Sequence, residues 1–166
     1  MMLSDQAAAL LEATELGLIQ LGEVMRWVDG IVRAMDDPPE WITELYALSA
    51  EGALSFESAF RQYSTGTLSV RQQVQIILVA HEAGKLSLRS TLSKLFLQVV
   101  CPNDVSVVYE PLDEQLVDAL VYWECHDDLD VFDEPLHDKL AEIFREYLSD
   151  ADEVAAVLPW RLENNA

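Results

Sequence analysis

Residues 125–138 contain the densest group of side chains that could carry out chemistry, because a cysteine, two histidines and several carboxylates follow one another there. Carboxylates and imidazoles are common protein ligands of divalent cations. An EF-hand beginning at Asp128 does not fit, since Phe132 and Asp133 stand where an oxygen ligand and a glycine are needed, and Lys139 replaces the bidentate glutamate. We therefore interpret the segment as a solvated acidic loop that caps the following helix, and we expect no metal and no cofactor.

The chain has three histidines, which are the usual general bases near neutral pH. The spacing of His126 and His137 matches no zinc signature. His81 and Glu82 begin like a metalloprotease helix motif, but Lys85 occupies the position of its second histidine. No Gly-x-Ser-x-Gly elbow, phosphate-binding glycine loop or dinucleotide fingerprint occurs. We predict no catalytic residues and a protein that is not an enzyme. The first alternative is a carboxylate-rich, metal-dependent enzyme that uses Asp127, Asp128, Asp130 or Asp133 together with His126 or His137.

The charge of the chain is strongly negative and unevenly distributed. Thirty acidic and ten basic residues give a formal net charge of −20. Residues 1–103 contain 12 acidic and 7 basic residues, a balance of −5, whereas residues 104–166 contain 18 and 3, a balance of −15. Such a field repels nucleic acids and anionic membranes and attracts basic partners. Acidity also keeps proteins soluble, but solubility does not require this concentration in the C-terminal third.

The densest acidic run, 124–134, directly follows two aromatic residues, Tyr122 and Trp123. An aromatic side chain beside carboxylates is typical of an anchor for a basic partner, although most aromatic side chains pack within a protein core. We predict that this segment binds a basic protein and neither nucleic acid nor membrane. The predicted partner-binding residues are Tyr122, Trp123, Glu124, Asp127, Asp128, Asp130, Asp133, Glu134 and Asp138.

In size, acidity, expected helical content and lack of catalytic motifs, the chain resembles the immunity proteins with which bacteria neutralise their own toxins. The resemblance is one of composition. It implies an inhibitory module that occludes a basic partner such as a toxin. A self-associating helical scaffold or adaptor, which would form a homodimer through its first helix, is the second alternative.

Cysteine usage and hydropathy favour a cytoplasmic protein. Cys101 and Cys125 have no CxxC spacing, which suits a reducing compartment. The sequence leaves open whether the two cysteines form a disulfide with each other. The longest uninterrupted apolar run, 76–80, is far too short to cross a bilayer. The first residues include Asp5 and no basic region, so a secretory signal is not expected.

Apolar residues recur every three or four positions through most of the chain, which is the period of amphipathic helices. We predict an all-α protein, a compact single-domain array of about 6–8 helices. It would have a long N-terminal helix over 4–35, in which a break or bend near Gly22 is left open because glycine is unfavourable inside a helix. At most one short isolated strand is expected, near 105–109. The predicted domain spans 1–162, with its acidic third beginning near 104, and residues 163–166 form a frayed tail.

The pattern Gly-x-Leu-Ser-apolar occurs three times, at 52–56, 66–70 and 84–88. It predicts a corner between two helices, in which the glycine takes the left-handed conformation and the serine caps the next helix. The three leucines, Leu54, Leu68 and Leu86, are expected to fold back on the preceding turn and to be structural. Replacing Gly66 by valine should destabilise the fold, because a β-branched residue resists the left-handed conformation.

Overall fold

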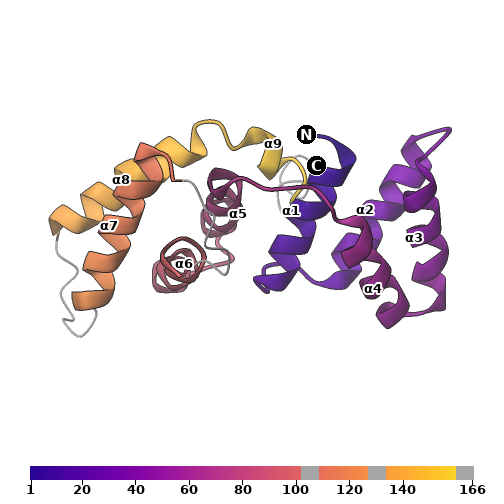
Figure 1. The fold of residues 1–166 in the computed structure, drawn as a ribbon, viewed down its shortest axis with the longest axis horizontal. Helices are drawn as coiled ribbons and strands as arrows, with labels where there is room; N and C mark the ends of the chain where they lie inside the picture. The colour runs from indigo at the N-terminus through magenta and orange to yellow at the C-terminus, as the bar shows by residue number, and fades with distance from the viewer. Residues whose placement is uncertain (102–108, 127–133, 160–166) are drawn as a thin grey trace. The chain divides into compact units, whose positions relative to one another are not determined.

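The computed structural model describes residues 1–101, 109–126 and 134–159, and its regular elements are helices (Figure 1). The predicted all-α class is confirmed. The strand expected near 105–109 falls outside these ranges except for Tyr109. The helices are α1 (Leu3–Glu15), α2 (Leu21–Ala34), α3 (Glu40–Glu51), α4 (Ala53–Tyr63), α5 (Val70–Glu82), α6 (Leu88–Leu95), the π-helix η1 (Phe96–Val100), α7 (Pro111–His126), α8 (Glu134–Leu148) and α9 (Asp152–Ala155).

The chain divides into two compact units. Unit 1 comprises Met1–Thr67 and Val157–Ala166, and unit 2 comprises Leu68–Ala156. Unit 1 therefore contains α1 to α4, and unit 2 contains α5 to α9 with η1. Among the helices of the described ranges, none is both long enough and apolar enough to cross a bilayer.

The segment 4–35 forms two helices in unit 1, which corrects the prediction of one long N-terminal helix. Gly17 has a φ of 69°, the left-handed conformation that ends a helix. Its amide donates to the carbonyl of Thr14 at 2.9 Å, and the amide of Leu18 donates to Ala13 at 2.8 Å. These two bonds are the Schellman pattern of a helix end. The periodicity failed to reveal the break because Gly17 occupies a position in the apolar stripe.

Aromatic side chains link the helices of unit 1. Trp27 of α2 lies 6.5 Å from Trp41 of α3, and Trp41 lies 6.0 Å from Tyr63 of α4, measured between ring centroids. Phe56 and Phe60 stack at 6.0 Å on the buried face of α4. Such ring pairs add stability beyond the area that they bury. The contacts of Trp41 with Trp27 and with Tyr63 lie where α3 packs against α2 and against α4.

The corner at Gly84 agrees with its prediction. Gly84 has a φ of 69°, and the amide of Lys85 donates to the carbonyl of Ala80 at 2.9 Å. Ser87 then caps α6 by accepting a hydrogen bond from the amide of Ser90 at 3.2 Å. Leu86 is half-buried, as expected of a residue that folds back on the preceding turn.

The other two corners differ from their predictions. Gly52 has a positive φ of 145°, but α4 begins at Ala53, so that Ser55 lies inside the helix and is not its cap. Leu54 is 84% exposed, and its predicted structural role is wrong. Gly66 does not have a positive φ. A Cβ atom on Gly66 would instead lie 2.6 Å from the backbone oxygen of Ser4, so the glycine is needed for close approach of two backbones. At this corner Ser69 caps α5 and Leu68 is half-buried.

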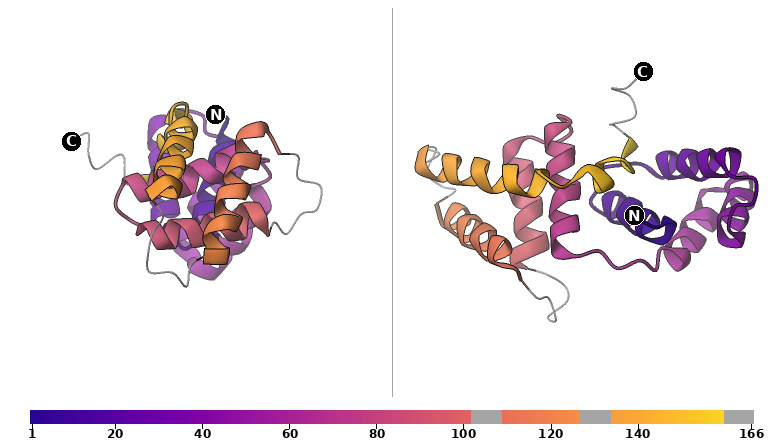
Figure 2. Two further views of the ribbon diagram at one scale, coloured as in Figure 1. Left: turned by 90° about the vertical axis from the view of Figure 1, so that its left-hand side faces the viewer. Right: turned by 90° about the horizontal axis from the view of Figure 1, so that it is seen from above.

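Helix α5 is central to unit 2, because every side chain from Val74 to Ala80 is buried. It packs against α6, α8 and α9, while α7 packs against α8 and η1 (Figures 1 and 2). A helix that is covered on several sides in this way needs apolar residues around most of its circumference. The continuous apolar run 76–80 supplies them.

A polar cluster connects α5, α7 and α8 inside unit 2. The hydroxyl of Tyr147 donates to Asp113, and the other carboxylate oxygen of Asp113 accepts from the amide of Glu110 at 2.8 Å. Asp113 is only 3% exposed and Tyr147 is fully buried. The side-chain amide of Gln75 donates to the carbonyl of Tyr147 at 2.9 Å, and Arg71 lies over the Tyr147 ring at 5.4 Å. The buried carboxylate is stable here because both of its oxygens have donors.

Replacing Tyr147 by phenylalanine should lower the free energy of unfolding by about 1–3 kcal/mol, because one oxygen of the buried Asp113 carboxylate loses its donor. Burial raises the pKa of Tyr147 well above its ordinary value, and the hydrogen bond to Asp113 adds to this rise. A raised pKa means that the stabilisation is fully present below the unfolded pKa of about 10 and is lost as the pH rises above it. The wild-type protein should therefore weaken more steeply than the variant above about pH 10.

Urea denaturation at several alkaline pH values measures both effects. Tyr46→Phe is the matched control, because that ring is 44% exposed on α3 and the substitution should change stability by less than about 0.5 kcal/mol. Equal stability of Tyr147→Phe and the wild type, with parallel pH dependence, would contradict this account of the polar cluster.

Candidate functional site

The exposed surface of α7 carries carboxylates and apolar side chains in one stripe. Glu114, Asp118, Val121, Tyr122 and Cys125 are all exposed, and their spacing of three or four residues places them on one face of the helix. We refer to these five residues as the α7 outer face. Val121 and Tyr122 are 41% and 43% exposed, which is high for large apolar side chains. The outer face thus has an acidic half followed by an apolar and aromatic half.

The opposite face of α7 is part of the core of unit 2, and it includes Trp123. Leu112, Leu116, Leu120 and Trp123 are buried there. Trp123 is 5% exposed, so the prediction that it anchors a partner on the surface is not supported by this conformation. The physical reason is the helical period, which places residue 123 three positions after Leu120 on the apolar face.

The remaining predicted binding residues fall into two groups. Tyr122 and Glu124 are exposed on α7, and Asp138 is exposed on α8. Glu134 begins α8. The loop residues Asp127, Asp128, Asp130 and Asp133 lie outside the described ranges.

A second row of carboxylates runs along α8. Asp138, Glu142 and Glu146 are exposed and follow one another at intervals of four residues, as Glu114 and Asp118 do on α7. Like charges at this spacing destabilise a helix by about 0.2–0.5 kcal/mol per pair. Within the described ranges, no ion pair involves any of these five carboxylates on α7 and α8 or the carboxylate of Glu124. In the part of the chain that the structure describes, the two helices therefore expose negative charges that have no ion-pair partner. Repulsion between these charges slightly lowers the stability of each helix.

Sequence reasoning concentrated on the loop and missed Glu114, Asp118, Glu142 and Glu146. The signal was present, because acidic residues separated by four positions on an amphipathic helix share one face. Assigning that face to solvent required the position of the buried stripe on each helix, which the apolar residues of α7 and α8 define.

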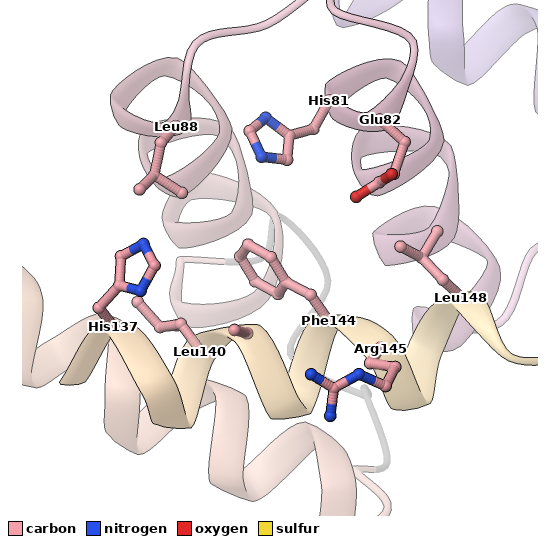
Figure 3. Close-up of a pocket in the computed structure, with 9 residues that line it drawn as sticks. His81, Glu82, Leu88, His137, Leu140, Phe144, Arg145 and Leu148 are labelled. Atoms are coloured by element: carbon pink, nitrogen blue, oxygen red, sulfur yellow. The ribbon is translucent and has the colours of Figure 1, made fainter. Parts of the chain in front are cut away.

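A groove of about 310 Å³ lies in unit 2 between α8 and the corner that joins α5 to α6 (Figure 3). One row of α8 side chains, Leu140, Phe144 and Leu148, contributes apolar surface to it. A neighbouring row on α8, formed by His137, Ala141 and Arg145, runs beside this apolar row. The residues that line the groove are His81, Glu82, Leu88, His137, Leu140, Ala141, Phe144, Arg145 and Leu148.

The imidazole of His81 is held in a defined orientation in this groove. Its Nδ1 lies 3.1 Å from the carbonyl oxygen of Leu86, and because a carbonyl only accepts, Nδ1 carries the proton. The edge of the ring meets Phe144, with centroids 6.3 Å apart and planes at 72°. In the neutral ring, Nε2 is then left as a hydrogen-bond acceptor.

No cluster of three or more histidine, cysteine or carboxylate side chains with metal-binding geometry occurs in the part of the chain that the structure describes. Cys101 and Cys125 are both free thiols at the surface, so the disulfide between them that the sequence left open is not formed. The self-association alternative was placed on one long first helix, which the structure divides into α1 and α2. Formation of a homodimer stays a prediction.

Comparison of the chain with protein-family models, curated proteins and solved structures finds no match. The unpaired carboxylates of α7 and α8 and the groove beside α8 are therefore the features from which a function can be inferred. Both are surface features of unit 2.

Proposed function

We propose that the protein binds a basic protein partner through the exposed carboxylates of α7 and α8 and occludes the surface of that partner. The observation that carries this proposal is the two rows of unpaired carboxylates at four-residue spacing. Mutual repulsion within each row is relieved when a basic surface approaches. Ordinary solubility does not require like charges to be placed at repulsive spacing on both helices.

The apolar half of the α7 outer face supplies the second requirement of such an interface. Charged residues mainly accelerate the encounter, whereas buried aromatic side chains prolong the complex. Tyr122 and Val121 lie one helical turn beyond Asp118 and are exposed enough to be covered by a partner. A toxin with a basic functional surface, the partner that the resemblance to immunity proteins implies, meets both requirements. Inhibition would then be steric and electrostatic, with no catalytic residue.

Binding of this partner should depend steeply on salt and on the carboxylates of α7. Raising salt from about 0.1 M to about 1 M shortens the screening length from about 10 Å to about 3 Å and should lower the association rate about tenfold or more. The double variant Glu114→Gln/Asp118→Asn should lower the association rate at low salt. Tyr122→Ala should mainly raise the dissociation rate. The measurement is affinity capture from native cytosol at both salt concentrations, followed by binding kinetics on the captured protein.

The double variant Asp36→Asn/Asp37→Asn is the matched control, because it removes the same charge from exposed positions of unit 1. It should leave the kinetics close to those of the wild type. If the control slows association as much as the α7 variant does, only net charge matters and the proposed surface is wrong. The triple variant Asp127→Asn/Asp128→Asn/Asp130→Asn tests whether the neighbouring loop adds to the same steering field.

A further inference from the structure

The exposed side of α7 has the residue spacing with which one helix packs along another. Four exposed residues follow one another at intervals of four, three and four positions: Glu114, Asp118, Val121 and Cys125. This alternation defines the narrow seam of a two-helix coiled coil. At about 100° per residue, the four side chains lie within about 60° of one another around the helix axis, opposite the buried face of α7. We refer to these four residues as the seam, which is about 16 Å long.

The chemistry of the seam changes along α7. Glu114 and Asp118 make its first half acidic, whereas Val121 and Cys125 make its second half largely apolar, with Tyr122 exposed beside them. A matching partner must therefore place cations opposite the first two positions and apolar side chains opposite the last two. Lysine and arginine suit the acidic half, because their apolar stems can cover the surface of the helix while the charged group reaches a carboxylate.

A helix fits this seam better than an extended segment does. The backbone amides and carbonyls of α7 are bonded within the helix, so its exposed face offers none of them to an extended chain. An extended peptide would lay its own backbone donors and acceptors on the apolar half of the seam without partners. A helix satisfies these groups internally, and it repeats its side chains at the same intervals of three and four residues as α7 does.

A second copy of α7 does not match the seam. In a parallel pair, Glu114 and Asp118 would each face the same residue of the other copy, so that like charges would be opposite one another. In an antiparallel pair, the two carboxylates would face Cys125 and Val121, which would bury charge against apolar side chains. Nucleic acids and anionic membranes are repelled by the same carboxylates. A basic amphipathic helix satisfies both halves.

We infer that the partner presents a basic amphipathic α-helix, and that this helix lies antiparallel along the α7 outer face. The inference rests on the proposed function, which supplies the basic partner. The antiparallel direction follows from the helix dipoles, because acidic residues are favoured near the N-terminus of a helix and basic residues near the C-terminus. Glu114 lies in the first turn of α7. Antiparallel packing therefore brings the C-terminal basic residues of the partner helix to Glu114 and Asp118, and its earlier apolar residues to Val121 and Cys125.

Binding of two designed peptides to the full chain tests the inference. The ordered peptide has about 16 residues, a length that is mostly unfolded when free, and carries two leucines and then two lysines at the intervals of the seam. The shuffled peptide has the same composition and charge, but its leucines and lysines are spread around the helix. Fluorescence anisotropy should show at least about tenfold tighter binding of the ordered peptide. Circular dichroism should show that this peptide becomes helical on binding.

Equal affinity of the two peptides would overturn the inference, because net charge alone would then explain binding. Binding of the ordered peptide without a gain of helix would overturn it as well.

A charge exchange tests the register of the pairing. Asp118→Lys should weaken binding of the ordered peptide about tenfold or more, because a lysine would then face a lysine. A peptide with glutamate in place of the lysine that faces position 118 should recover most of the lost affinity for this variant. Replacing the other lysine, which faces Glu114, should recover less. Position 118 is exposed, so the variant should fold, and thermal melting checks this. Equal recovery by both peptides would contradict the antiparallel register.

Two double variants provide the matched comparison of charge. Glu114→Gln/Asp118→Asn should weaken the ordered peptide about fivefold or more. Asp36→Asn/Asp37→Asn, which removes the same charge from unit 1, should leave its affinity close to that of the wild type. An equal effect of the two variants would contradict the placement of the peptide on α7.

Failure of this inference and failure of the proposed function give different results. If a basic partner is captured and depends on the α7 carboxylates, while the ordered peptide binds no better than the shuffled one, only the helix inference fails. If the ordered peptide binds the seam but no basic partner is captured from cytosol, the proposed function fails and the fit of a basic helix to α7 stands.

Discussion

Replacing Trp123 by alanine is expected to lower the free energy of unfolding by about 3–5 kcal/mol, the usual effect of removing a large buried aromatic side chain. Trp123 is 5% exposed on the face of α7 that belongs to the core of unit 2. Its removal leaves a cavity in a densely packed region, and the surrounding helices close such a cavity only in part. Natural domains are stable by about 5–15 kcal/mol, so this single change removes a large share of the total. Chemical denaturation followed by far-ultraviolet circular dichroism measures it.

Tyr122→Ala is the matched control, because the neighbouring ring is 43% exposed on the α7 outer face. It should change stability by less than about 1 kcal/mol and, under the proposed function, should weaken partner binding. The two neighbours thus separate stability from binding. A small loss of stability in Trp123→Ala, together with a large loss of binding, would contradict the assignment of Trp123 to the core and would restore it as the anchor.

Replacing Gly66 by alanine is expected to destabilise unit 1 by about 1–3 kcal/mol, and valine should destabilise it more. The added Cβ would lie 2.6 Å from the backbone oxygen of Ser4 and 2.9 Å from both the carbonyl carbon of Ser4 and Cα of Asp5. All three are backbone atoms, so a side-chain rotation cannot relieve the overlap, and the start of α1 must shift. Thermal or urea denaturation measures the loss.

Replacing Gly30 by alanine should have the opposite effect and raise the free energy of unfolding. Gly30 lies inside α2, and apart from its two chain neighbours and the backbone of its own helix, nothing lies within 4 Å of the Cβ that alanine would add. Alanine should stabilise the helix there by about 0.5–1 kcal/mol, because glycine loses more backbone entropy on folding. If both substitutions change stability equally, the effect at Gly66 would be a general property of glycine and not a consequence of the close contact with Ser4.

The helical class and the buried faces of several helices can be predicted from the amino-acid sequence alone. Side chains four residues apart, such as Leu116 and Leu120, lie on one face of a helix, and apolar faces are buried. The same period places Trp123 on that face, although we had predicted it as a partner-binding residue. The capping serines Ser69 and Ser87 were also readable, because a hydroxyl that accepts from the amide three residues later is a local interaction. These features depend on neighbours within one or two helical turns.

Contacts between residues far apart in the chain could not be predicted from the sequence and became visible in the three-dimensional structure. The Gly-x-Leu-Ser pattern looks identical at Gly66 and Gly84, yet Gly84 ends a helix in the left-handed conformation while Gly66 makes room for the backbone of α1. In the same way, His81 and Phe144 are 63 positions apart, and their rings meet edge to face only through the packing of α8 on α5. Local periodicity specifies the face of each helix that is buried. It does not specify which other helix covers that face, because an apolar face can pack about equally well against many other apolar surfaces.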